Sequence, residues 1–72
     1  MMRKDPRWLE KVTGRSVLIH TRDERTVEGV ITAAYEDGVL VGAAKLHGDG
    51  PVVPMAGDVF VPRGNIVLVQ AP

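Results

Sequence analysis

The side chains that most often carry out catalysis are scarce in this sequence. It has no cysteine, and its only serine, Ser16, stands at no triad-like spacing from the two histidines, His20 and His47. The glycines at 48 and 50 lead neither into a lysine-serine or lysine-threonine pair nor into a helix, which indicates a turn and not a phosphate loop. Two histidines without thiolates are too few for a metal cage. We therefore expect no enzyme, no metal site and no cofactor.

Three other side chains have types suited to binding a nucleic acid. Tyr35 can stack on a base, which is worth ~1–3 kcal/mol, or it can cap one end of the fold. Arg63 can hold a phosphate or a base face, or it can pair with a carboxylate of the acidic turn 36–37. Asn65 can contact a base edge, or it can simply shape a turn, because asparagine tolerates left-handed backbone geometry. Both interpretations stay open at each position.

Positive charge is concentrated at the start of the chain. Residues 1–15 carry five basic and two acidic side chains, a net +3, whereas the remainder carries four and seven, a net −3. The N-terminal segment could therefore attract a polyanion, or it could be an ordinary solvated surface. Its candidate binding residues are the basic side chains Arg3, Lys4, Arg7 and Lys11.

A short helix is predicted over residues 6–13. Asp5 can cap its first turn, and Pro6 suits the first helical position. Trp8, Leu9 and Val12 then form one apolar stripe, and Gly14 can end the helix in a left-handed conformation. Two turns are not stable alone in water, so this helix must dock on a larger element.

That larger element is a sheet, because from residue 16 the apolar pattern has a period of two. Residues 16–22 and 26–33 read as a hairpin around a polar turn, with the odd-numbered residues buried and Gly29 at a sharp bend or a close backbone approach. Turns at 36–38, 47–51 and 62–65 separate three further strands, over 39–46, 52–61 and 66–70, of which the second is interrupted by Pro54 and Gly57. Short connections favour an antiparallel meander closed on itself as a bent, five-stranded barrel.

The length of 72 residues allows one domain, with the helix over about 6–13 and the barrel over about 15–70. A domain this small buries only about 60% of its unfolded surface and lacks disulfides, so oligomerisation is its remaining source of stability. The apolar strands 59–61 and 66–69 carry little charge to protect their edges, and pairing between subunits would cover them. No apolar stretch is long enough for a membrane span or a signal peptide, and a cytoplasmic location is expected.

Two motifs, over residues 14–31 and 57–69, resemble those of the Sm-like family, which comprises the Sm, Lsm and Hfq proteins. The first has the family's alternating strand, polar turn, and glycine followed two residues later by an aliphatic residue. The second has a strand, an arginine-glycine turn at Arg63-Gly64, and a closing strand. The resemblance spans nearly the whole chain.

The resemblance implies a strongly bent SH3-like barrel whose fourth strand pairs with the fifth strand of the next subunit, in a homo-oligomeric ring of roughly five to seven copies. It also implies binding of single-stranded, uridine- or adenine-rich RNA at the pore, by residues at the positions of Tyr35, Asp37, Arg63, Gly64 and Asn65.

The sequence departs from the family pattern at several of these positions. Tyr35 stands where the family has an aspartate, and Asp37 stands near the place of its asparagine. Pro62 precedes Arg63, Ile66 comes one residue early, and the tyrosine-lysine-histidine motif of Hfq is absent. Two hypotheses follow: an RNA-binding ring, or a structural or adaptor ring that binds protein and has lost the RNA pocket.

Overall fold

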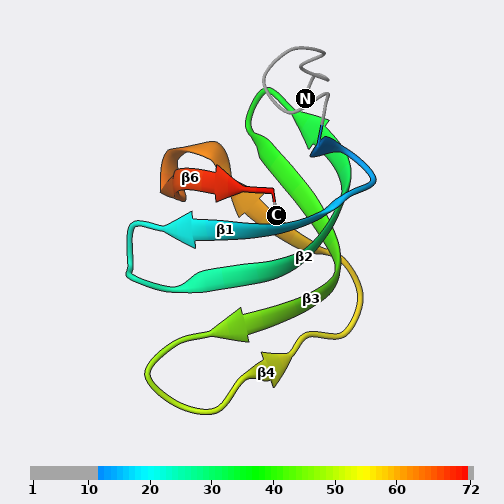
Figure 1. The fold of residues 1–72 in the computed structure, drawn as a ribbon. Helices are drawn as coiled ribbons and strands as arrows, with labels where there is room; N and C mark the ends of the chain where they lie inside the picture. Colours follow the sequence, from blue (N-terminus) through cyan, green and yellow to red (C-terminus); the bar gives the residue numbers. More distant parts are fainter. Residues whose placement is uncertain (1–11, 72) are drawn as a thin grey trace.

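The alternating segments fold into a curved, barrel-like antiparallel sheet (Figure 1). The computed structural model describes residues 12–71. The strands are β1 (Ser16–Thr21), β2 (Thr26–Tyr35), β3 (Gly38–His47), β4 (Val53–Pro54), β5 (Val59–Pro62) and β6 (Ile66–Gln70), and the 3-10 turn η2 (Arg63–Asn65) joins the last two. The mostly β, antiparallel architecture expected from the sequence is confirmed.

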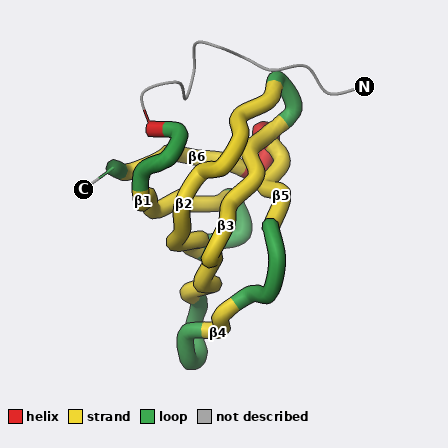
Figure 2. The backbone as a smooth tube through the Cα atoms, turned by 90° about the vertical axis from the view of Figure 1, so that its right-hand side faces the viewer, coloured by secondary structure: helices red, strands yellow, loops and turns green. Residues whose placement is uncertain are grey.

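The sheet has the order β4-β3-β2-β1-β6, and β5 pairs with β3 beyond the end of β4 (Figure 2). The first half of β3 pairs with β5, from Gly38↔Pro62 to Val41↔Val59, and its last residues pair with β4. No ladder joins β5 to β6 within residues 12–71. Among the described residues the expected meander is therefore not closed by hydrogen bonds, and both β5 and β6 keep an edge that no other described strand pairs with.

Irregularities in the β2–β3 ladder bend the two longest strands. Two residues of β3, Ala43 and Ala44, stand opposite Gly29, and Thr32 is an extra residue in β2. A Cβ on Gly29 would lie 2.5 Å from a methyl carbon of Val41 and 2.8 Å from the carbonyl oxygen of Gly42, so only glycine allows this approach. The predicted role of Gly29 at a close backbone approach is confirmed.

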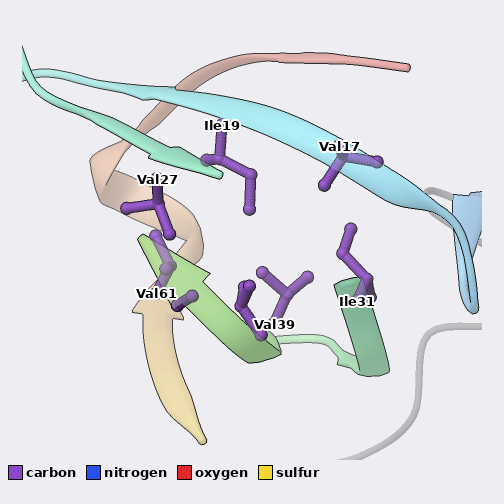
Figure 3. Packing of buried hydrophobic residues seen from close by; sticks show 8 residues of the cluster. Val17, Ile19, Val27, Ile31, Val39 and Val61 are labelled. Carbon is purple, nitrogen blue, oxygen red and sulfur yellow. The ribbon is translucent and has the colours of Figure 1, made fainter. Parts of the chain in front are cut away.

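The core lies on the inner face of this bent sheet (Figure 3), where the six labelled side chains point toward one another. The largest fully buried side chains are Ile19, Ile31, Val17, Val39 and Val41. Each contributes about 1.5–3 kcal/mol through burial. The expected odd-numbered face is correct as far as Ile31, but the extra residue at Thr32 changes the register, and Ala33 is only half-buried.

The fourth strand expected over residues 52–61 is two short strands, so residues 12–71 form six strands and not the expected five. Pro54 has no N–H to extend the pairing of β4, and Gly57 adopts a positive φ of 72°, which no regular strand accommodates. The chain between them leaves β3 at one end and rejoins it as β5.

The helix expected over residues 6–13 lies outside the described residues except for its last two positions. Val12 is in a 3-10 conformation and Thr13 is in a turn, so the described part gives no support to an α-helix. Gly14 does adopt the left-handed conformation expected of it, with φ of 87°, and its N–H donates to the Ile31 carbonyl at 2.8 Å. Over residues 12–71, no helix is long and apolar enough to cross a membrane.

Candidate nucleic-acid interface

The two turns that carry the predicted RNA-binding residues contact each other in the structure. The β2–β3 turn, Glu36-Asp37, lies beside η2, and the N–H of Arg63 donates to the carbonyl of Asp37 at 2.7 Å. Tyr35 pairs with Gly38 to close the first turn, and Gly38 pairs in turn with Pro62, the residue before η2. The two predicted binding turns are about 26 residues apart in the sequence. They lie side by side because β3 pairs with both β2 and β5.

Gly38 lets these two turns approach. A Cβ at this position would lie 2.3 Å from the carbonyl oxygen of Val61 and 2.7 Å from the ring of Phe60. The nearest obstacle is backbone, which cannot move aside as a flexible side chain would. The contact between the β2–β3 turn and β5 therefore depends on the absence of a side chain at residue 38.

The β1–β2 turn supplies a third support. The backbone N–H of Arg22 donates to the Asn65 carbonyl at 2.9 Å, and the Arg22 Nε donates to the Gly64 carbonyl at 2.7 Å. Carbonyl groups at the end of a helical turn lack intrahelical partners, and Arg22 satisfies two of those in η2. The turn that carries Arg63 is thus held from both sides, by Asp37 and by Arg22.

The five predicted site residues therefore come from two adjacent turns and differ mainly in exposure. Asp37, Arg63 and Gly64 are exposed, whereas Tyr35 and Asn65 are half-buried. Within residues 12–71 the carboxylate of Asp37 makes no ion pair, so of the two carboxylates in the 36–37 turn considered as partners of Arg63, that of Asp37 does not pair with it. The basic residues Arg3, Lys4, Arg7 and Lys11 lie outside the described residues.

A small, mostly apolar hollow of about 160 Å³ opens beside η2. Its lining includes Asn65, together with Phe60 and Pro62 of β5 and Thr21 at the end of β1. A larger hollow of about 460 Å³ adjoins it, since Asp23, Arg25 and Leu46 line both. This hollow extends between the β1–β2 turn and the 48–51 loop, and none of the predicted site residues lines it. Of these two hollows, only the smaller one touches the predicted site.

The two histidines make contacts between strands. The His20 ring lies 3.3 Å from the Thr26 hydroxyl and 3.2 Å from the Gln70 side-chain oxygen, so it links β1 with β2 and β6. His47 Nε2 lies 2.8 Å from a carboxylate oxygen of Glu28. No cluster of three potential metal ligands occurs in the described part of the chain.

Sequence reasoning did not select Arg22, which it placed at the end of the first strand, where the polar turn begins. Its partner Gly64 lies 42 residues further along the chain, and no local pattern predicts such a contact. The sequence gives one indirect sign of this contact: an arginine ends the strand of the first motif, and the second motif contains a turn at Gly64-Asn65.

Comparison with known proteins bears on the fold alone. No protein-family model matches the sequence, and no curated protein matches it significantly. Seven chains from solved structures do match. One, from the crystal structure of the NatC complex bound to CoA, superposes with a TM-score of 0.79 at 19% sequence identity, covering 94% of this chain and 88% of that chain. The chain thus shares its fold with a component of that complex.

Proposed function

We propose that this chain is an Sm-like protein that assembles into a homo-oligomeric ring of roughly five to seven copies and binds single-stranded, uridine- or adenine-rich RNA at the pore. The observation that carries the proposal is the contact of the two turns, from the carbonyl of Asp37 to the N–H of Arg63 at 2.7 Å. It gathers an aromatic ring, an arginine and a turn asparagine at one end of the sheet.

The two unpaired edges support ring formation. β5 offers Phe60, 38% exposed, and β6 offers Val67 and Leu68, 59% and 50% exposed. An uncovered apolar edge strand invites pairing with another chain. Because the β5 and β6 edges are different surfaces, their pairing is head-to-tail, and repeated head-to-tail contacts that close generate a ring. A domain this small also gains stability from burial between subunits.

The chemistry of the site supports RNA as the ligand. A ring places one copy of the site in each subunit around a common axis, so a single strand can contact several copies in succession. Tyr35 stacks on a base, which is a sequence-tolerant contact, and Arg63 binds the phosphate or the base face. Asp37 opposes this binding, because its exposed carboxylate lies beside the path of a polyanion.

A second candidate function is an adaptor ring that binds protein. The exposed carboxylate of Asp37 favours it, and so does the likeness to a chain found in the multi-subunit NatC complex. In this alternative the edges of β5 and β6 retain their role in assembly, and the turns that meet at η2 contact a protein partner.

A filter-binding screen against short homopolymeric RNAs separates the two functions. We expect the wild-type protein to bind oligouridylate or oligoadenylate, and Tyr35→Ala and Arg63→Ala each to weaken binding by ~1–3 kcal/mol without changing the oligomeric mass. If the wild-type protein at low salt binds no homopolymer more tightly than a neutral control protein does, the RNA function is wrong and the adaptor function replaces it.

Charge variants distinguish RNA binding in a defined pocket from RNA binding to a diffuse basic surface. Asp37→Asn removes one negative charge per subunit, so it should strengthen RNA binding if the turn faces the strand. Charge reversal at Arg3, Arg7 and Lys11 should weaken all sequences alike, because contacts to the phosphate backbone carry no base identity. Unchanged affinity of Asp37→Asn would mean that the β2–β3 turn points away from the bound RNA.

A further inference from the structure

Arg22 lies at the candidate RNA site but belongs to neither of the two turns predicted to form it, the β2–β3 turn and η2. It is exposed and begins the β1–β2 turn, directly after β1. Its backbone N–H and its Nε bind the carbonyls of Asn65 and Gly64, at 2.9 and 2.7 Å, so that its guanidinium lies against the turn that carries Arg63. Two arginines from segments 41 residues apart are therefore fixed to the same three-residue turn.

The β1–β2 turn is itself well fixed, so Arg22 is held in place. The N–H of Thr21 donates to the Arg25 carbonyl at 2.9 Å, and the N–H of Glu24 donates to the Thr21 carbonyl at 3.2 Å. The buried Thr21 hydroxyl contacts the Asp23 carboxylate and lies 3.1 Å from the Arg25 carbonyl. An arginine held in this way loses less side-chain entropy on binding a ligand than a freely rotating one.

The outer end of this guanidinium is available for an anion. A guanidinium has five N–H donors, and only the one on Nε is used in the contact with Gly64. The neighbouring carboxylate, that of Asp23, is engaged by Thr21 and lies 3.9 Å from the Nε of Arg25. Within the described residues, Arg22 has no carboxylate at ion-pair distance. No carboxylate of residues 12–71 thus neutralises its charge through an ion pair.

We infer that Arg22 is a phosphate-binding residue of this site: its Nε and backbone N–H hold η2, and its two terminal amino groups bind the phosphodiester oxygens of the strand whose bases contact Tyr35. The inference rests on the proposed RNA function and names a third turn, and a second arginine beside Arg63, as parts of its pocket. The planar terminal edge of a guanidinium matches two phosphate oxygens, which an ammonium cannot do.

The test compares Arg22→Gln with Arg25→Gln, which removes the same charge from the same turn at a side chain directed to Asp23. Affinity for oligouridylate and oligoadenylate is measured at several salt concentrations. We expect Arg22→Gln to weaken binding by about tenfold to a hundredfold. The slope of log affinity against log salt should fall by roughly 0.7 for each phosphate that the protein no longer neutralises. Arg25→Gln should change both quantities much less, because the Nε of Arg25 already lies 3.9 Å from the Asp23 carboxylate and its charge acts on the strand only at a distance.

Arg22→Lys distinguishes a phosphate contact from a purely structural role. The ammonium retains the charge but not the planar edge, so we expect the wild-type salt slope with only part of the affinity restored. If Arg22→Gln matches Arg25→Gln, or if it weakens binding without lowering the salt slope, the phosphate contact is wrong and Arg22 only supports the turn.

Binding of pyrophosphate distinguishes an error in the role of Arg22 from an error in the proposed RNA function. If the wild-type protein binds no RNA, thermal unfolding is measured with and without pyrophosphate. A rise in melting temperature that Arg25→Gln keeps and Arg22→Gln loses would retain Arg22 as an anion-binding residue of a protein that does not bind RNA. No rise in the wild-type protein would overturn the inference together with the RNA function.

Discussion

Two parts of this small sheet place their apolar side chains in opposite environments. In β1, β2 and the first half of β3, the large aliphatic residues face inward, and Val17, Ile19, Ile31, Val39 and Val41 are fully buried. In β5 and β6, Phe60, Val67 and Leu68 remain 38–59% exposed on strands with an unpaired edge. The first part supplies most of the buried core, to which Val61 of β5 also belongs. The second part carries, beside its core contacts, apolar surface that the monomer does not bury, and we propose that this surface serves assembly.

The largest loss of stability should come from a cavity among the buried side chains of β1, β2 and β3. Ile31→Ala removes a fully buried side chain between β1 and β3, so it should lower the free energy of unfolding by about 2–5 kcal/mol. Chemical denaturation at one fixed protein concentration measures this change. Val52→Ala, at a residue that is 47% exposed, should stay within about 0.5 kcal/mol of the wild type. Equal losses in the two variants would contradict the assignment of the core.

A smaller loss of stability is expected where the β2–β3 turn contacts β5. Gly38→Ala forces a methyl group against the Val61 carbonyl and the Phe60 ring, so it should destabilise the fold by about 1–3 kcal/mol and disturb the contact between Asp37 and Arg63. Gly48→Ala is the matched control, because a Cβ there meets nothing within 4 Å. Thermal melts of both variants compare them, and a neutral Gly38→Ala would show that the turns do not pack as described.

The exposed edge of β6 should affect assembly more than folding. Val67→Lys places a charge on the unpaired edge without entering the core, so it should shift the oligomer toward smaller species while the circular dichroism spectrum stays unchanged. Val52→Lys, on an exposed valine of the loop before β4, should leave the oligomer intact. Val69 is unsuitable for this test because it is half-buried and packs against the core, so Val69→Lys would also lower the stability of the fold.

The smallest effect is a gain in stability. Ala43 has a positive φ of 50° within the bulged part of β3, which is a conformation that glycine adopts without steric conflict. Ala43→Gly should therefore raise the free energy of unfolding by roughly 0.5–1 kcal/mol. Ala56→Gly, at an exposed residue without positive φ, should show no gain. If both variants lose stability equally, the bulge is not strained.

The sequence predicted features that depend on neighbouring residues better than those that depend on distant ones. The inward-facing residues of β1, the bounds of β6 and the role of Gly29 all followed from local patterns, because period and glycine position are local properties. The half-buried state of Ala33 did not follow, since the extra residue at Thr32 exists only relative to the partner strand. The interruption of the fourth strand at Pro54 and Gly57 was predicted from the sequence, but the pairing of its two pieces with different parts of β3 was not.

The same distinction applies to the candidate site. Tyr35, Asp37, Arg63, Gly64 and Asn65 were selected from turn chemistry and family resemblance, and the structure brings their two turns together. Arg22 could not be selected, because its function in the fold is a hydrogen bond to a carbonyl 42 residues away. Long-range polar contacts to backbone carbonyls leave no periodicity in the sequence.

The central claim is that β5 of one copy pairs with β6 of the next in a closed ring, and native mass spectrometry of the wild-type protein at micromolar concentration tests it most directly. We predict a single dominant closed species of roughly five to seven copies, which does not grow further as the concentration rises, because head-to-tail pairing that closes has no free edge left. A monomer, or an open series of masses without a preferred size, would contradict it.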